Sequence, residues 1–302
     1  MPLPLAIPLG CWLVAVGVLA LRGRDLRLVN LLVVSFTCVL GLACVGIALQ
    51  AAARHTAKYD LWLYTADMAL GAPSFLLARL MRPGAFYTVL VWLYDAMPMT
   101  MLLAYAAHLL WAGKPERVLA AFALNFGTGY CIYLLFPACG PGYAFARFPA
   151  FAPAAPALHP LHLLAPPNCM PSLHMSTALL VCWFLRPWRI PHAAAMLNVV
   201  LTVLATLASG EHYLVDLIVA APFTVFVYCA SGRQWRAGAA WLAAVLAWCS
   251  LLRFGAAWIT AVPGAFWGIC ALTVGAAWLY SVYPRWLPLT KASTNWPAEA
   301  PG

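Results

Sequence analysis

The stretch GEHYLVDLIVAAPFTVFVYCAS, residues 210–231, joins a short polar segment to a long apolar segment. It opens with Glu211, His212 and Asp216, and it continues as an apolar run without a further charge. Similar apolar runs of about 17 to 25 residues recur along the chain, and each is long enough to cross a hydrocarbon layer of roughly 30 Å as a helix. The chain is therefore predicted to be embedded in a membrane.

The composition supports this prediction for the whole chain. Of its 302 residues, 65% are hydrophobic and 8% are charged, whereas about a quarter of the residues of a soluble domain are charged. We expect an all-α fold, a polytopic membrane helical bundle. The nine predicted spans cover residues 5–21, 28–50, 86–111, 118–137, 172–185, 190–208, 213–230, 237–252 and 256–280.

Sidedness depends on residues 60–82, where Asp60, Asp67, Gly71 and Pro73 interrupt an apolar run. Charges inside a bilayer are costly, so we expect this segment to lie at the surface. One face then carries 11 of the 17 basic residues, which favours that face as the inner one. These are Arg22, Arg24, Arg27, Lys114, Arg117, Arg186, Arg189, Arg233, Arg236, Arg285 and Lys291.

The same reasoning divides the chain into four parts. We expect N-terminal spans and an interfacial segment over 1–83, a catalytic core over 84–231, C-terminal spans over 232–287 and a disordered tail over 288–302. Residues 139–170 are rich in proline and glycine and predict a loop at a membrane face. The formal charge of +9 is scattered between apolar runs, which argues against nucleic-acid binding.

Two polar clusters stand at the starts of predicted spans. His212 and Asp216 are four residues apart and so share one face of a helix. In NCMPSLHMS, residues 168–176, Ser172 and His174 stand at the entrance to another span, where free backbone N–H groups favour an anion. The 38 residues between the histidines allow two crossings with a tight turn, so both histidines are expected on the same side.

Two imidazoles, a carboxylate and an anion site suit nucleophilic attack on phosphorus. One imidazole attacks, the carboxylate fixes its tautomer, and the other imidazole protonates the leaving oxygen. His212 is the better nucleophile because Asp216 can orient it.

PSLH at 171–174 followed by GEHYLVD at 210–216 resembles the second and third signature motifs of the type 2 phosphatidic acid phosphatase (PAP2) superfamily. The resemblance covers roughly residues 86–230. It implies that His212 forms a phosphohistidine supported by Asp216, that His174 is the acid, and that Ser172 holds phosphate oxygens. We also expect Tyr143 and Gly210 at the substrate site.

Within the superfamily, YLLFPACGPGY at 133–143 resembles the branch that contains inositol phosphorylceramide synthase, and YDAMP at 94–98 resembles a degenerate first motif. Two departures concern the basic residues that bind phosphate. The family's serine and arginine ahead of the nucleophile fall on Ala205 and Thr206, and its lysine before Arg82-Pro83 falls on Phe75. Arg147 and Arg82 are the candidates to supply the missing charge.

The remaining polar residues leave several alternatives open. Cys139 and Cys169 bracket the loop and would form either two thiols or a disulfide in an oxidising compartment. His159 and His162 have no specific metal spacing, so we expect no metal and no cofactor.

The function that best fits the sequence is a lipid phosphatase or phosphotransferase that acts on a lipid phosphate or phospholipid within the bilayer. The expected location is a bacterial inner membrane, with the active site on the outer face. Transfer of an inositol phosphate type of head group onto a lipid alcohol is one alternative. A membrane transporter or scaffold without activity, compatible with the missing basic residues, is the other.

Overall fold

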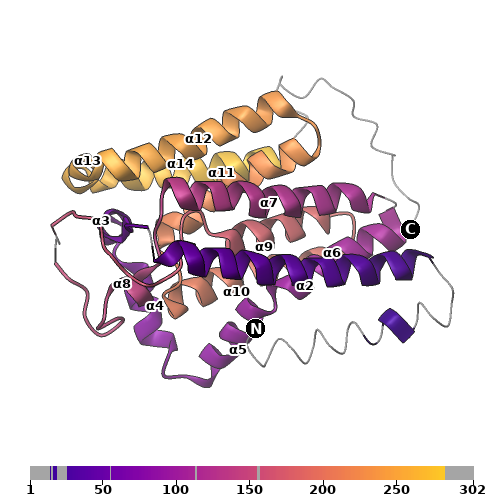
Figure 1. Cartoon of the computed structure of the whole chain (residues 1–302). Coiled ribbons are helices and arrows are strands. Elements are labelled where there is room, and N and C mark those ends of the chain that lie inside the picture. The colour runs from indigo at the N-terminus through magenta and orange to yellow at the C-terminus, as the bar shows by residue number, and fades with distance from the viewer. Residues whose placement is uncertain are drawn as a thin grey trace.

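A computed structural model describes residues 14, 16–18, 26–54, 56–112, 114–154 and 157–282. The expected span over 5–21, apart from residues 14 and 16–18, and the expected tail over 288–302 lie outside the described residues. Figure 1 shows the helices. They are α2 (Leu26–Ala53), α3 (Asp60–Ala69), α4 (Pro73–Met81), α5 (Ala85–Asp95), α6 (Met97–Ala107), the π-helix η1 (His108–Ala112), α7 (Pro115–Leu135), α8 (Pro141–Ala144), α9 (Leu173–Phe184), α10 (Arg189–Ser209), α11 (Leu214–Ser231), α12 (Trp235–Phe254), α13 (Ala256–Ala261) and α14 (Pro263–Val282).

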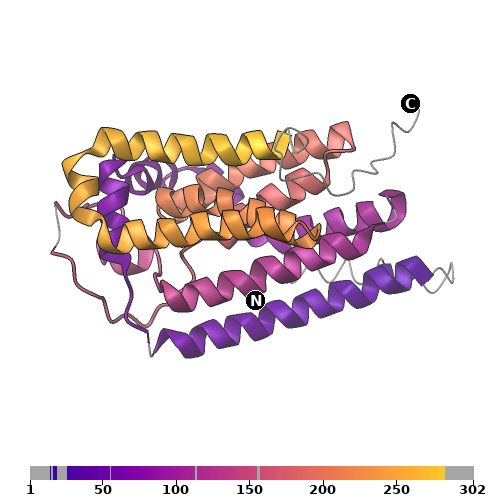
Figure 2. The ribbon, with the colours of Figure 1, turned by 90° about the horizontal axis from the view of Figure 1, so that it is seen from above.

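The expected all-helical membrane bundle is confirmed. Six of the described helices are long and apolar enough to cross a membrane, namely α2, α7, α10, α11, α12 and α14. Figure 2 shows α2, α7, α12 and α14 running along a common direction. α11 is buried along nearly its whole length and touches α7, α9, α12 and α14, as expected for a helix that is apolar on all sides. Large apolar side chains such as Phe36, Leu135 and Phe254 are exposed on the outer helices, where lipid is the solvent.

Three of the expected spans differ from the prediction. The one expected over 172–185 is the 12-residue helix α9, which is shorter than the helices that could cross a membrane. Two others are broken, and a proline stands at each break. The span expected over 86–111 consists of α5 and a second helical part, Met97–Ala112, bent by 51°. Pro98 lies in the first turn of α6. It has no N–H to continue the hydrogen bonds of α5, and its ring clashes with the preceding turn, so a continuous helix cannot form there. The span expected over 256–280 is also interrupted. There the residue before Pro263, Val262, leaves the helical region with φ −133°.

The segment over residues 60–82, on which the predicted sidedness depends, begins and ends at the same end of the bundle. α3 and α4 are bent by 83° at Gly71 and Ala72, which both have positive φ. Asp60 at the start of α3 hydrogen-bonds to Gly140, and Arg82 just after α4 hydrogen-bonds to Ser209. Because Gly140 and Ser209 lie in segments that hydrogen-bond to each other at this end, the contacts agree with a segment that does not cross.

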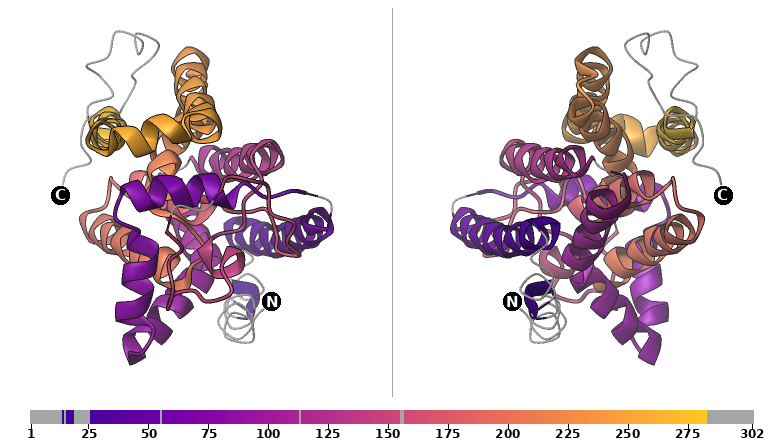
Figure 3. Two further views of the ribbon diagram at one scale, coloured as in Figure 1. Left: turned by 90° about the vertical axis from the view of Figure 1, so that its left-hand side faces the viewer. Right: turned by 90° about the vertical axis from the view of Figure 1, so that its right-hand side faces the viewer.

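The proline-rich loop over 139–170 lies across the same end and is held by side chains of the N-terminal part. Lys58 forms an antiparallel backbone bridge with Leu161, and its buried ammonium donates to the carbonyls of Ala53, Thr56 and Leu163. Tyr64 donates its hydroxyl hydrogen to the carbonyl of Pro153. Figure 3 (left) looks onto this end, where α3 and the loop lie across the helices. Apart from the short helix α8, the described part of the loop is therefore ordered by these contacts rather than by its own secondary structure.

Candidate active site

His212 lies in the short link between α10 and α11, and glycine and aspartate fix the ends of both helices. Gly210 adopts φ +76° and ends α10 in the left-handed conformation that glycine favours. The Asp216 carboxylate accepts a hydrogen bond of 2.8 Å from the backbone N–H of Tyr213 and so caps the start of α11. The link places His212 in the interior, where its exposed fraction is 2%.

The tautomer of His212 follows from its hydrogen-bond partner. Its Nδ1 lies 2.9 Å from the carbonyl oxygen of Cys169 and 3.6 Å from Oδ2 of Asp216. A carbonyl oxygen can only accept, so Nδ1 carries the hydrogen and the lone pair of a neutral ring is left on Nε2. This is the arrangement that a nucleophilic imidazole requires.

His174 reaches the same place from α9. It is the second residue of that helix, and its ring centroid lies 6.2 Å from that of His212. The ring of Tyr94 stacks on His174 with centroids 3.6 Å apart and planes 16° apart. In the sequence Tyr94 belongs to a degenerate motif, and the motif alone assigns it no role. Its place at the bend between α5 and α6 explains how a residue distant in sequence meets the histidine.

Ser172 is the N-cap of α9. Its Oγ accepts a hydrogen bond of 3.3 Å from the backbone N–H of Met175, and its own N–H donates to the carbonyl of Asp216 at 3.3 Å. Ser172 therefore ties the start of α9 to the start of α11. Its expected role in holding phosphate oxygens stays a prediction.

Gly210 and Tyr143 are neighbours of the link that carries His212. The hydroxyl of Tyr143 donates to Oε1 of Glu211 at 2.9 Å, and the backbone N–H of Gly142 donates to the carbonyl of Gly210 at 2.8 Å. Burial raises the pKa of Glu211, and the hydrogen bond from Tyr143 and the charges of His212 and Arg82 oppose that rise. These contacts place Tyr143 and Gly210 next to the link that carries His212, and their expected role at the substrate site stays a prediction.

The two candidate arginines differ in position. Arg82 donates from Nε to the carbonyl of Ala208 at 3.0 Å and from Nη2 to the carbonyl of Ser209 at 2.6 Å. Arg147 is exposed, and its guanidinium lies 5.4 Å from the centre of the Phe151 ring. Arg82 is thus the one brought against the segment that precedes His212.

Two positions where the family has a cation carry uncharged residues here, Phe75 and Thr206, and their contacts are with uncharged groups. Phe75 packs edge-on against Tyr64 and Phe148, with ring centroids 5.6 and 4.8 Å away. The Thr206 hydroxyl donates to the carbonyl of Thr202 within its own helix. Neither position supplies a charge to the site.

Two buried aspartates, which in the sequence are visible only as interruptions of an apolar run, hold the site together. The Asp60 carboxylate accepts from the backbone N–H groups of Cys139 and Gly140 and from the hydroxyl of Tyr213. The Asp67 carboxylate accepts from the Ser74 hydroxyl at 2.7 Å and from the backbone N–H of Leu214 at 2.8 Å. The available signal was an ionisable residue inside an apolar segment, which is a functional candidate by default.

Cysteine and histidine side chains near the site are possible metal ligands. Cys139 and Cys169 are both free thiols. Burial, reinforced by the Asp216 carboxylate, holds the pKa of Cys169 well above its usual range, so its thiol donates to Asp216 Oδ2 at 2.6 Å. In the described part of the chain, one group of possible metal ligands lies close together, and it consists of Cys169, His212 and Asp216. His159 and His162 are exposed in the loop and are not part of it.

The fold and the site define an all-helical membrane protein with two histidines and a supporting carboxylate at one end of its bundle. A comparison with protein-family models agrees with that class: residues 60–230 match the PAP2 superfamily, and the chain belongs to this superfamily. The match begins at α3, the helix that supplies both Asp60 and Asp67. No match was found among curated proteins or among solved structures.

Proposed function

We propose that the protein is a lipid phosphatase or phosphotransferase that works through a phosphohistidine on His212 without a metal ion. The observation that carries the proposal is the position of His212 Nδ1, 2.9 Å from a carbonyl oxygen and 3.6 Å from the Asp216 carboxylate. These partners hold the proton on Nδ1 and leave Nε2 as the nucleophile. Membership of the PAP2 superfamily supports a phosphate ester as the substrate.

The reaction would proceed in two displacements. Nε2 of His212 attacks phosphorus while the bond to the leaving oxygen breaks, and His174 donates the proton that this oxygen takes up. The Asp216 carboxylate stabilises the positive charge that develops on the His212 ring. In the second step water or an alcohol attacks the phosphohistidine, and His174 removes its proton.

The lipid substrate would reach this end of the bundle from the bilayer. Arg82 is the stronger candidate for binding the phosphate, since it lies against Ala208 and Ser209 just ahead of the nucleophile. Ser172 with the first N–H groups of α9 is the second element. The proposed location is a bacterial inner membrane with this end on the outer face, which follows from the distribution of basic residues.

A second candidate is transfer of a phosphorylated head group, of the inositol phosphate type, from a phospholipid to a lipid alcohol. Phe75 and Thr206 supply no positive charge. Glu211, the residue before His212, is acidic, and the charge of Asp95 helps to raise its pKa. A phosphodiester carries one negative charge, whereas a phosphomonoester carries nearly two at neutral pH. A site with few cations favours the diester.

The first experiment measures phosphate release from a panel of lipid phosphates and lipid pyrophosphates by the purified protein in detergent, with chelator present. We expect release by the wild type and a loss on the order of 10⁴-fold or more in His212→Ala. His159→Ala is the matched control, because His159 is exposed in the loop and its ring hydrogen-bonds to the nearby Ala157 carbonyl. Release that persists in His212→Ala would disprove the phosphohistidine.

The second experiment separates hydrolysis from transfer. The protein is incubated with a phosphatidylinositol-type donor, with and without a ceramide or diacylglycerol acceptor. A product that depends on the acceptor and on His212 would establish head-group transfer. Absence of both phosphate release and transfer would leave the scaffold alternative.

A further inference from the structure

The thiol of Cys169 has no part in the reaction described above, although it touches the catalytic carboxylate. Its Sγ lies 2.6 Å from Oδ2 of Asp216. Sγ, a ring nitrogen of His212 and a carboxylate oxygen of Asp216 all lie within 4.8 Å of one another, and all three residues are buried. Among the described residues, Oδ1 of Asp216 is buried and has no hydrogen-bond partner. The site therefore has an unused carboxylate oxygen beside a thiol and an imidazole.

The chemistry of these three groups is that of a zinc ligand set. Thiolate, neutral imidazole and carboxylate are the side chains that bind Zn²⁺ in proteins. The ionised forms of Cys169 and Asp216 together carry two negative charges, which a divalent cation neutralises. Charge balance matters here because an unpaired charge is costly in a buried site.

The distances are compatible with such an ion. Zinc bonds of about 2.0 to 2.3 Å in a tetrahedron place the ligand atoms about 3.5 Å apart. Nδ1 of His212 and Oδ2 of Asp216 are already 3.6 Å apart. Sγ of Cys169 and Oδ2 are closer, at 2.6 Å, because a hydrogen now joins them. Loss of that hydrogen and a rotation that turns Oδ1 toward the ion would open the gap.

We propose that Cys169, His212 and Asp216 form an inhibitory site for a soft divalent cation such as Zn²⁺. Binding converts the Cys169 thiol to a thiolate, and its proton leaves to solvent. Nδ1 can bind zinc only through a lone pair, so the one proton of the neutral ring moves from Nδ1 to Nε2 and the hydrogen bond to the Cys169 carbonyl is given up. No redox step is involved. The Nε2 lone pair that would attack phosphorus is then lost, and this consequence rests on the proposed function, whereas the binding does not.

The binding test uses the full-length protein, purified with chelator and then freed of it. Zn²⁺ binding is measured by titration calorimetry, and Co²⁺ is added in parallel to reveal a thiolate-to-cobalt absorption band. We expect Cys169→Ser to bind one equivalent fewer than the wild type and to lose the band. Cys139→Ser is the matched control, since Cys139 is a buried thiol near the other end of the same loop and is hydrogen-bonded to Asp60 instead. Equal binding by wild type and Cys169→Ser overturns the proposal.

A measurement on the wild type avoids dependence on the folding of a variant. X-ray absorption of the protein loaded with one equivalent of zinc should show one sulfur ligand at about 2.3 Å. A shell of nitrogen and oxygen alone overturns the site. Zinc should also abolish phosphate release or transfer, with recovery on chelation. If the enzyme is active but no sulfur ligand is found, the zinc site is disproved and the proposed function stands. If zinc binds through sulfur but the protein shows no turnover, the zinc site stands and the proposed function is disproved.

Discussion

At the scale of single residues, the environment of one imidazole carries most of the functional argument. The proton on Nδ1 of His212 faces two acceptors, the carbonyl of Cys169 at 2.9 Å and the carboxylate of Asp216 at 3.6 Å. The carbonyl fixes the tautomer, and the carboxylate adds the negative charge that stabilises the ring once it has attacked. The two partners therefore have separable effects on the reaction.

Asp216→Asn tests this division. We expect kcat to fall by roughly 10² to 10⁴ while KM changes little, because the tautomer is retained by the Cys169 carbonyl and the stabilising charge is lost. Steady-state kinetics with the best lipid substrate would measure both constants. A variant with wild-type kcat would show that the carboxylate acts only as the cap of α11.

The stacking of Tyr94 on His174 predicts an effect on the pH profile. A ring face stabilises a nearby cation by about 0.5 to 1 kcal/mol, so Tyr94 favours the protonated His174 that must donate a proton. Tyr94→Leu should move the alkaline limb of the kcat profile down by roughly half a pH unit, and Tyr94→Phe should leave it in place. A lower rate without any shift of the limb would reduce Tyr94 to a packing residue.

At the scale of elements, the site depends on the close approach of two turns. A Cβ added to Gly210 would lie 2.5 Å from Cε1 of Phe148 and 3.0 Å from the backbone nitrogen of Gly142, and its φ of +76° is already unfavourable for other residues. The loop that carries Gly142 would have to move away from the link that carries His212. Such a movement would alter the site as well as the stability.

Gly210→Ala should therefore lower the free energy of unfolding by about 1 to 3 kcal/mol and reduce activity. Gly275→Ala is the matched control, since a Cβ at that position in α14 meets nothing within 4 Å. Thermal unfolding in one detergent would compare the two variants. Equal melting temperatures would contradict the close approach of the turns.

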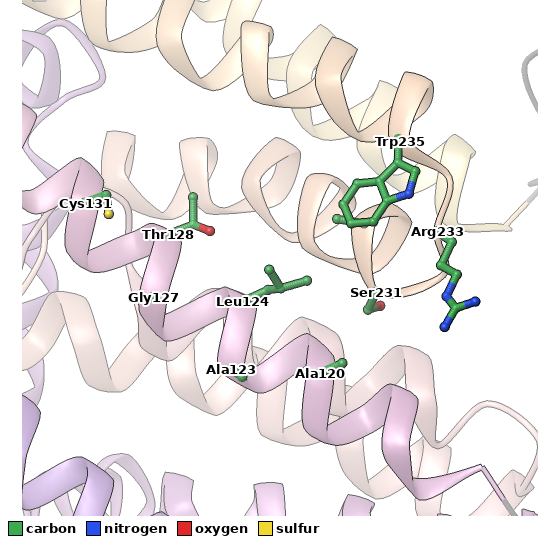
Figure 4. A pocket seen from close by; sticks show the side chains of 10 residues that line it. Ala120, Ala123, Leu124, Gly127, Thr128, Cys131, Ser231, Arg233 and Trp235 are labelled. Atoms are coloured by element: carbon green, nitrogen blue, oxygen red, sulfur yellow. The ribbon is translucent and has the colours of Figure 1, made fainter.

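At the scale of the whole molecule, the long helices separate two ends, and the contacts place both histidines and the proline-rich loop at one of them. α7, α10 and α12 all end there, and α9, α11 and α14 all begin there. The opposite end has its own concave surface. A groove of about 660 Å³ between α7 and the turn from α11 to α12 is lined by small and apolar residues, with Arg233 and Trp235 at its edge (Figure 4).

Sidedness is open to direct measurement. Cys44 and Cys131 are the exposed cysteines among the described residues. In a background with both of them and Cys11 replaced by serine, His159→Cys should react with an impermeant maleimide from outside the cell. Lys114→Cys, in the turn before α7, should react only in inverted vesicles. Labelling in the opposite sense would place the active site on the inner face and overturn the argument from basic residues.

The sequence by itself determined the membrane class and most of the spans, and it predicted that His174, His212 and Asp216 lie close together, as they do in the structure. These follow from the lengths of apolar runs and from spacing within short motifs, which are properties of neighbouring residues. The breaks at Pro98 and Pro263 were missed because a proline is tolerated in the first turn of a helix as well as at a break, and the apolar pattern continues through both.

The tertiary structure alone decided which distant side chains support the trio. Asp60 meets Tyr213 across 153 positions, Asp67 meets Leu214 across 147, and Cys169 meets Asp216 across 47. Arg82 was preferred over Arg147 on the same kind of contact. Such pairings depend on how the helices cross and on where the loop over 139–170 lies. The order of residues along the chain fixes neither, because the same apolar helix can be buried against several different neighbours at similar cost.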